Sequence, residues 1–147
     1  MKTIQSTVAM SLLGLTLLVA VTLPARAEPK KANDSKAGLI AEGQRIVENV
    51  GLCADCHARR LPSGEFDRAQ WLQGALLSFQ PTVKMPWSAD APAISGLPGY
   101  NEEQAVQLLT TGKRANGVVL RPPMPAYRFS EAEAKAVVAY LKSLPRP

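Results

Sequence analysis

Every cysteine and histidine of this chain lies within five consecutive residues. The two cysteines and the one histidine form the segment Cys53-Ala54-Asp55-Cys56-His57, and the rest of the 147 residues contains neither type. C-x-x-C-H is the pattern through which haem is attached covalently. The two thiols add to the vinyl groups of one porphyrin edge, and the imidazole next to them projects under the ring to ligate the iron. The segment therefore predicts one covalent haem c per chain, bound through Cys53, Cys56 and His57.

Three other uses of the two cysteines fit the sequence less well. A thioredoxin-like dithiol normally follows a strand in a βαβ unit, and no strand pattern precedes Cys53. A structural zinc ion takes four protein ligands, whereas only three candidates exist in the chain. A plain disulfide suits an exported protein but leaves the adjacent His57 without a role. Haem attachment is the interpretation that uses all three residues.

The iron takes a sixth ligand from the chain or leaves that position open. With one histidine in the chain, a bis-histidine site within it is excluded, which leaves Met85 and Met124 in the part that follows residue 27. Met124 lies in the segment 121–125, where three prolines fix the backbone φ angle and stiffen the loop. A stiff loop favours Met124 as the ligand. Met85 is then a core or haem-wall residue, since methionine often fills irregular gaps.

The first residues have the features of a secretory signal. Lys2 precedes the uncharged apolar run 8–23, and Ala25-Arg26-Ala27 places small residues where signal peptidase cleaves. The run has 23 − 8 + 1 = 16 residues, fewer than the roughly 20 needed to span a bilayer. We therefore expect cleavage before Glu28 and a periplasmic protein, with membrane attachment only if the segment is retained.

The predicted organisation is a signal peptide (1–27), a flexible tail (28–36) and one domain (37–147). Removal of residues 1–27 lowers Lys+Arg from 17 to 15 and leaves all 12 acidic residues, so the formal charge falls to 15 − 12 = +3. Such a charge, with no basic stripe interleaved with aromatics, argues against nucleic-acid binding. Only 5% of the residues are aromatic, so a bound cofactor would add apolar surface to a thin core.

Apolar periodicity and capping residues predict four helices and no sustained strand. The expected helices run from Leu39 to Gly51, after Asp67, from Asn101 to Thr111, and after Ser130. An apolar stripe indicates the second helix, with Phe66 and Trp71 as a hydrophobic staple at its start and Pro81 at its end. The stripe residues are Trp71, Leu72, Ala75, Leu76 and Phe79. Long Pro- and Gly-rich connections, 80–99 and 113–129, complete an all-α fold whose loops wrap a ligand.

The whole region after residue 36 resembles the class I c-type cytochromes. The resemblance is carried by an amphipathic helix, C-x-x-C-H, a Pro-flanked Met124 and a C-terminal helix, and the segments 122–127 and 136–145 are similar to cytochrome subunits that serve bacterial dehydrogenases. It implies a small cytochrome c fold and haem c with His57 proximal and Met124 distal. It also implies that the N- and C-terminal helices cross, with Gly43 and Tyr140 at the contact. The family further implies a proline carbonyl that accepts a hydrogen bond from Nδ1–H of His57, and Pro62 and Pro81 are the candidates.

The expected function is transfer of single electrons to and from redox protein partners. The alternatives are a haem enzyme or gas sensor with an open sixth site, and a fixed electron-transfer subunit of a dehydrogenase complex. Residues expected to line the haem are Trp71, Leu76, Phe79, Trp87, Leu120 and Tyr127. Basic residues near the predicted haem edge, which would steer acidic partners or pair with the haem propionates, are Arg59, Arg60, Lys113, Arg114, Arg121 and Arg128.

Overall fold

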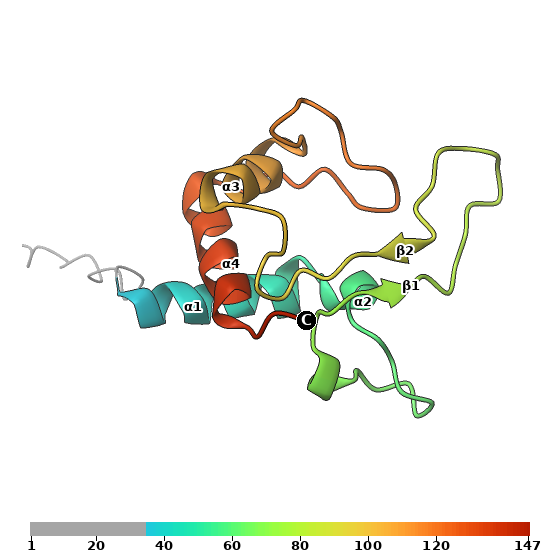
Figure 1. Ribbon diagram of the computed structural model, residues 1–147, viewed down its shortest axis with the longest axis horizontal. Coiled ribbons are helices and arrows are strands. Elements are labelled where there is room, and N and C mark those ends of the chain that lie inside the picture. The colour runs from blue at the N-terminus through green and yellow to red at the C-terminus, as the bar shows by residue number, and fades with distance from the viewer. Residues whose placement is uncertain (1–34) are drawn as a thin grey trace, which may run out of the picture. The chain divides into compact units, whose positions relative to one another are not determined.

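The computed structural model describes residues 35–147, and its regular structure is mostly helical (Figure 1). The helices are α1 (Lys36–Arg45), α2 (Ala54–His57), α3 (Glu102–Thr111) and α4 (Glu131–Ser143). The π-helical turn η2 (Ile46–Val50) continues α1, and the 3-10 turn η3 (Arg68–Gln70) follows α2. The strands β1 (Ala75–Leu76) and β2 (Asp90–Ala91) form one antiparallel pair. Four helices joined by long loops confirm the predicted all-α class.

The predicted signal peptide (1–27) and most of the predicted tail (28–36) lie outside the described residues. Helix α1 begins at Lys36, three residues before the expected start at Leu39. The side chain of Ser35 caps it by accepting a hydrogen bond from the backbone N–H of Gly38 at 3.0 Å. Lys36 therefore belongs to the helix and not to the tail.

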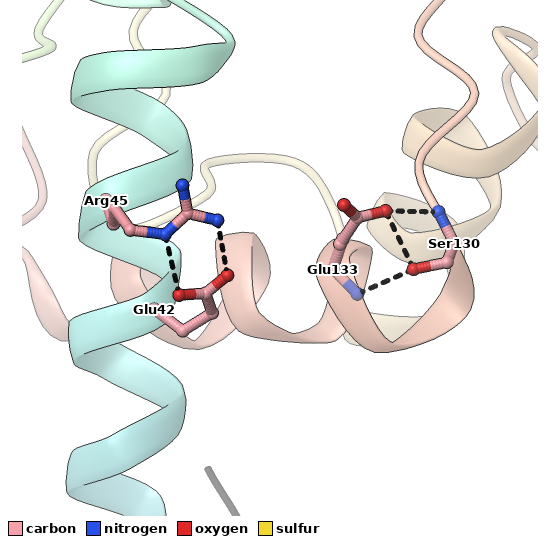
Figure 2. A network of polar contacts seen from close by, with 4 residues as sticks. All are labelled: Glu42, Arg45, Ser130 and Glu133. Carbon is pink, nitrogen blue, oxygen red and sulfur yellow. Dashed lines mark hydrogen bonds and ion pairs between the residues drawn. The ribbon is translucent and has the colours of Figure 1, made fainter. Parts of the chain in front are cut away.

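Helices α3 and α4 start where their capping boxes predict. At α4, the backbone N–H of Glu133 donates to Oγ of Ser130, and the backbone N–H of Ser130 donates to Oε2 of Glu133 at 2.8 Å (Figure 2). Asn101 and Gln104 make the same reciprocal pair at α3. Each box satisfies N–H groups that have no partner inside the helix, so both starts are set by local sequence.

Helix α4 crosses α1 at Gly43 (Figure 1). A Cβ atom at Gly43 would lie 1.9 Å from the carbonyl oxygen of Ala136 and 2.8 Å from Cβ of Tyr140. Only a residue without a side chain allows so close an approach. The core forms beside this contact, where Ile46 and Val47 of η2 are buried with Val137 and Leu141 of α4. The crossing that the family resemblance implies is confirmed.

A polar network extends the same contact. The hydroxyl of Tyr140 donates to Oε1 of Glu48 and accepts from Nε1 of Trp71, each at 3.0 Å. Glu48 lies on η2, and Oε2 of its carboxylate accepts from the guanidinium of Arg68 at 3.4 Å. The network thus joins α4 and η2 to the turn η3, and the Tyr140 hydroxyl acts in it as both donor and acceptor.

The predicted second helix is wrong. Asp67 does cap a turn, because its side chain accepts from the N–H of Ala69 at 3.1 Å, but only the three-residue η3 follows. The chain then takes positive φ angles at Leu72 (57°) and Gly74 (89°), which a right-handed helix cannot contain. Leu72 becomes fully buried, whereas Leu76 is 85% exposed, so the residues of the apolar stripe do not share a face.

We predict that Gly43→Ala destabilises the protein by about 1–3 kcal/mol, the usual cost of forcing an extra carbon into a packed contact. Urea unfolding of the oxidised protein measures this change. The matched control is Ala41→Ser, two residues earlier on the exposed side of α1, which should change the unfolding free energy by less than about 0.5 kcal/mol. Equal stability of the two variants would contradict the close approach of α1 and α4.

Candidate functional site

A largely apolar cavity of about 430 Å³ contains the predicted site residues. It is bounded by the turn α2, by the segment that follows β2, by α3 and the loop after it, and by α4. Its lining includes Cys53, Cys56, His57, Leu77, Pro92, Leu97, Leu108, Leu109, Leu120, Met124, Tyr127, Val137 and Leu141. A second, more open hollow of about 680 Å³ lies between α3 and the start of α4. That hollow is lined mainly by charged and polar residues, with Val106 and Phe129 among them, and it holds none of the predicted site residues. The apolar cavity is therefore the candidate site.

The turn α2 brings Cys53, Cys56 and His57 together. The backbone N–H of His57 donates to the carbonyl of Cys53 at 2.8 Å, which closes one helical turn across the motif. Both cysteines are free thiols in this structure, and both line the cavity with His57. Burial raises the pKa of Cys53 to about 11 and also raises the pKa of Cys56. Before haem is attached, both groups are therefore mainly protonated at neutral pH.

His57 is oriented by one hydrogen bond. Its side chain is buried, and Nδ1 lies 2.7 Å from the carbonyl oxygen of Pro92. Burial lowers the pKa of His57, with a smaller opposing contribution from that hydrogen bond, so the ring is neutral at pH 7. Since a carbonyl can only accept, the proton of the neutral ring is assigned to Nδ1, and Nε2 keeps the lone pair that binds a metal.

The partner of His57 is neither of the prolines considered from the sequence. Pro62 and Pro81 were the candidates, and Pro92 provides the carbonyl. Pro62 lies in the exposed turn before Gly64, and Pro81 lies in the connection between β1 and β2. Pro92 follows β2 directly, so its position depends on a strand pair of two residues each, which is too short to produce a periodic pattern.

Leu72 and Gly74, neither of which was predicted to belong to the site, hold the Pro92 segment in place. The carbonyl of Leu72 accepts from the backbone N–H groups of Ile94 (2.9 Å) and Ser95 (3.1 Å). Gly74 donates its N–H to the carbonyl of His57 at 2.9 Å. A Cβ atom at Gly74 would lie 2.8 Å from the carbonyl oxygen of Ala91, so the segment can approach only because the residue is glycine. A glycine inside a predicted helix was the available signal.

Met124 and Met85 have different surroundings. Met124 lines the cavity, whereas Met85 is 41% exposed and is not part of the lining. Two hydrogen bonds hold the loop that carries Met124. The backbone N–H of Ser88 donates to the carbonyl of Pro122 at 2.8 Å, and the side-chain hydroxyl of Tyr127 donates to the carbonyl of Gly51. Burial raises the pKa of Tyr127 to about 12, so its hydroxyl keeps the proton that it donates.

Of the six side chains expected to line the haem, Leu120 and Tyr127 line the cavity. The other four do not. Leu76 is exposed, Phe79 packs edge-on against Trp87, and Trp71 donates to Tyr140 at the helix crossing. The sequence showed their apolar character but could not show that the second helix is replaced by a tight turn.

Charged side chains at the cavity come mainly from the loop after α3. Arg114, Arg121 and Asp90 belong to the lining, and neither arginine makes an ion pair within residues 35–147. Nε1 of Trp87, one residue before the lining residue Ser88, is buried without a hydrogen-bond partner in the same part of the chain. The part of the lining that α4 contributes is thus apolar, whereas other segments contribute the two arginines and Asp90.

These residues fit a covalently attached haem. The thiols and the imidazole reach one apolar cavity from a single turn, and its volume lies within the range of about 300–1,000 Å³ common for cofactor sites. The two arginines match the two carboxylates that haem carries. In the described part of the chain, no group of three or more His, Cys, Asp and Glu side chains could hold a metal ion directly. That part also has no helix of the length and hydrophobicity that a membrane span requires.

Comparison with known proteins agrees with the geometry. Residues 40–145 match the Cytochrome c family. Over 108 residues the chain is 28% identical to the fructose dehydrogenase cytochrome subunit of Gluconobacter japonicus, and this match covers 70% of the chain but 21% of that protein. The chain thus spans about a fifth of that relative's length. Because the family match extends over well more than half of its residues, the chain belongs to the cytochrome c family, with a small cytochrome c fold and covalently bound haem c.

Proposed function

We propose that this protein carries single electrons in the periplasm, and that His57 and Met124 ligate its haem iron. The observation that carries the proposal is that His57 and Met124 line the same largely apolar cavity. The chain has no second histidine that could serve as the sixth ligand. Within residues 35–147 the other methionine, Met85, is partly exposed and lies outside the lining.

Bound haem supplies an iron that gains or loses one electron between its ferric and ferrous states. The Nδ1–H of His57 donates to Pro92, which fixes the plane of the imidazole, raises its basicity and leaves Nε2 free to ligate. Val137 and Leu141 of α4 contribute to an apolar wall that excludes water. Such a wall disfavours the extra positive charge of the ferric state, so it raises the reduction potential.

Arg114 and Arg121 affect the balance between ferric and ferrous haem through their positive charge. Both line the cavity, and both remain without an acidic partner among the described side chains. Their guanidinium groups suit the two propionates of haem, since arginine binds carboxylates through paired N–H donors. A positive charge beside the haem also disfavours the ferric state, so the two arginines and the apolar wall shift the reduction potential in the same direction.

The named relative supports a second candidate for the cellular role. That protein is a cytochrome subunit of fructose dehydrogenase, and a fixed subunit would perform the same electron transfer with a permanent partner. Co-purification under mild conditions separates a fixed subunit from a free carrier. A haem enzyme or gas sensor with an open sixth site is the less favoured alternative, because a peroxidase uses an acid or base on the distal side and no second histidine exists to provide it. The proposal of a periplasmic location rests on the signal peptide that the sequence predicts for residues 1–27.

We predict that Met124→Ala abolishes the weak thioether-to-iron band at the red edge of the ferric spectrum and lets the ferrous protein bind carbon monoxide. The reason is that the substitution removes the thioether that we assign as sixth ligand. Met85→Ala is the matched control and should leave the band unchanged. A pyridine-haemochrome assay and the intact mass confirm haem in both variants. Loss of the band in Met85→Ala with its retention in Met124→Ala would contradict the assignment.

We predict that Gly74→Ala raises the reduction potential and destabilises the protein by about 1–3 kcal/mol. An alanine side chain would press on Ala91 and displace the Pro92 carbonyl from Nδ1 of His57, which makes the imidazole a weaker donor to ferric iron. Redox titration measures the potential. Gly64→Ala is the control, because Gly64 has the same φ of 89° and nothing within 4 Å of an added Cβ. An equal potential in both variants would exclude a role for Gly74 in positioning Pro92.

We predict that Arg121→Gln lowers the reduction potential, because a positive charge at the cavity is lost and the ferric state becomes less unfavourable. The shift should be largest at low ionic strength, where charges are least screened. The control is Arg128→Gln, an exposed residue of the same loop that does not line the cavity. Equal shifts in the two variants would indicate a general effect of net charge and not a local one.

A further inference from the structure

The segment that carries Met124 has no regular structure of its own. We call residues 121–129 the Met124 loop. Its backbone is tied to the rest of the protein at Pro122, whose carbonyl accepts from Ser88, and at Phe129, whose N–H donates to Leu109 at 3.2 Å. Four residues lie between Pro122 and Tyr127, and Met124 is one of them. The position of Met124 therefore depends on contacts made on either side of it.

Tyr127, three residues after Met124, makes a side-chain hydrogen bond that leaves the loop. Its hydroxyl donates to the carbonyl oxygen of Gly51, and within the described chain this is the one side-chain hydrogen bond that leaves the Met124 loop for another segment. Gly51 ends η2 and stands two residues before Cys53. The hydrogen bond thus connects the Met124 loop to the backbone that leads into the haem-attachment turn.

Gly51 is itself held firmly. Its N–H donates to the carbonyl of Ile46 at 2.7 Å, and the N–H of Cys53 donates to the carbonyl of Val47 at 3.0 Å. A Cβ atom at Gly51 would lie 3.3 Å from Sγ of Cys53 and 3.6 Å from Cζ of Phe129. Gly51 is therefore a firmly held residue close to Cys53, and a loop tied to its carbonyl is held at a set position relative to the motif.

We propose that Tyr127 is a positioning residue whose hydroxyl latches the Met124 loop to Gly51 and so keeps the sixth coordination position closed to outside ligands. The inference rests on the proposed ligation by Met124. A weak thioether bond to iron competes with any external donor that reaches the metal when the loop lifts. An external ligand binds only the open form, so its apparent affinity is proportional to the fraction of molecules that are open. Breaking the latch raises that fraction.

The hydroxyl can be tested apart from the ring. The ring of Tyr127 stacks on Phe129 with centroids 4.8 Å apart and planes inclined by 10°. Tyr127→Phe keeps this stacking and removes only the hydrogen bond to Gly51. A second tyrosine offers a matched control: the Tyr140 hydroxyl makes two hydrogen bonds at the α1–α4 crossing, and Tyr140 does not line the cavity. Tyr140→Phe lowers stability without releasing the Met124 loop.

The experiment is a titration of the ferric holoprotein with imidazole, followed by loss of the thioether-to-iron band. Tyr127→Phe should bind imidazole roughly fivefold more tightly than the unmodified protein, the factor expected when one hydrogen bond that closes the loop is lost. Tyr140→Phe should bind imidazole as the unmodified protein does, although its unfolding midpoint in urea falls. Haem content is measured for each variant by the pyridine-haemochrome assay.

Two results would overturn the latch while the ligand assignment stands. In the first, Tyr127→Phe binds imidazole no more tightly than the unmodified protein. In the second, Tyr140→Phe gains as much affinity as Tyr127→Phe, which would trace the gain to lower stability in general. Met124→Ala tests the ligand assignment itself. If that variant keeps the thioether-to-iron band, Met124 is not the ligand, and both the proposed ligation and the latch are wrong.

Discussion

The carbonyl oxygen of Pro92 accepts a hydrogen bond from Nδ1 of His57 at 2.7 Å, and much of the structure around the cavity serves to place these two atoms. His57 is fixed by one helical turn that is closed onto Cys53. Pro92 is fixed indirectly, because the segment after β2 is bound to the carbonyl of Leu72 and passes close to Gly74. A neutral imidazole with its proton on Nδ1 can ligate only through Nε2, so the backbone contacts of Leu72 and Gly74 help to orient His57 as the proximal ligand that we propose.

A feature could be predicted from the sequence when the residues that determine it lie close together along the chain. The caps at Asn101 and Ser130 and the motif at Cys53 depend on residues three or four positions apart, and the structure has the two caps where they were expected. The region from Asp67 to Phe79 was misjudged because its apolar residues repeat at helical spacing, whereas its conformation is set by contacts with residues 91–95. Long-range contacts of this kind override local periodicity. The glycine at position 74 was the one local sign that a helix would not form.

The same reasoning explains why Pro92 was missed and why Met124 was favoured. Pro92 approaches His57 across 35 positions of sequence, and nothing near either residue indicates that contact. Met124 was favoured because prolines on both sides restrict its loop, which is a local property. The structure adds what the prolines cannot provide, namely the hydrogen bonds through Pro122 and Tyr127 that tie the stiff loop to other segments. The stiffness of the loop follows from its own prolines, whereas its position depends on hydrogen bonds to other segments.

The two sides of the cavity therefore differ in how they are built. The His57 side consists of a helical turn, a strand pair and several backbone hydrogen bonds, which tie it to more than one segment of the chain. The Met124 side consists of an irregular loop held by a small number of separate hydrogen bonds, so it can open locally while the core at the α1–α4 crossing stays folded. An electron carrier benefits from little rearrangement between its two oxidation states, and a stiff loop tied at several points meets that need. With Met124 as the sixth ligand that we propose, the weakest of those ties, and not the global stability of the fold, would set how readily the sixth position is exposed.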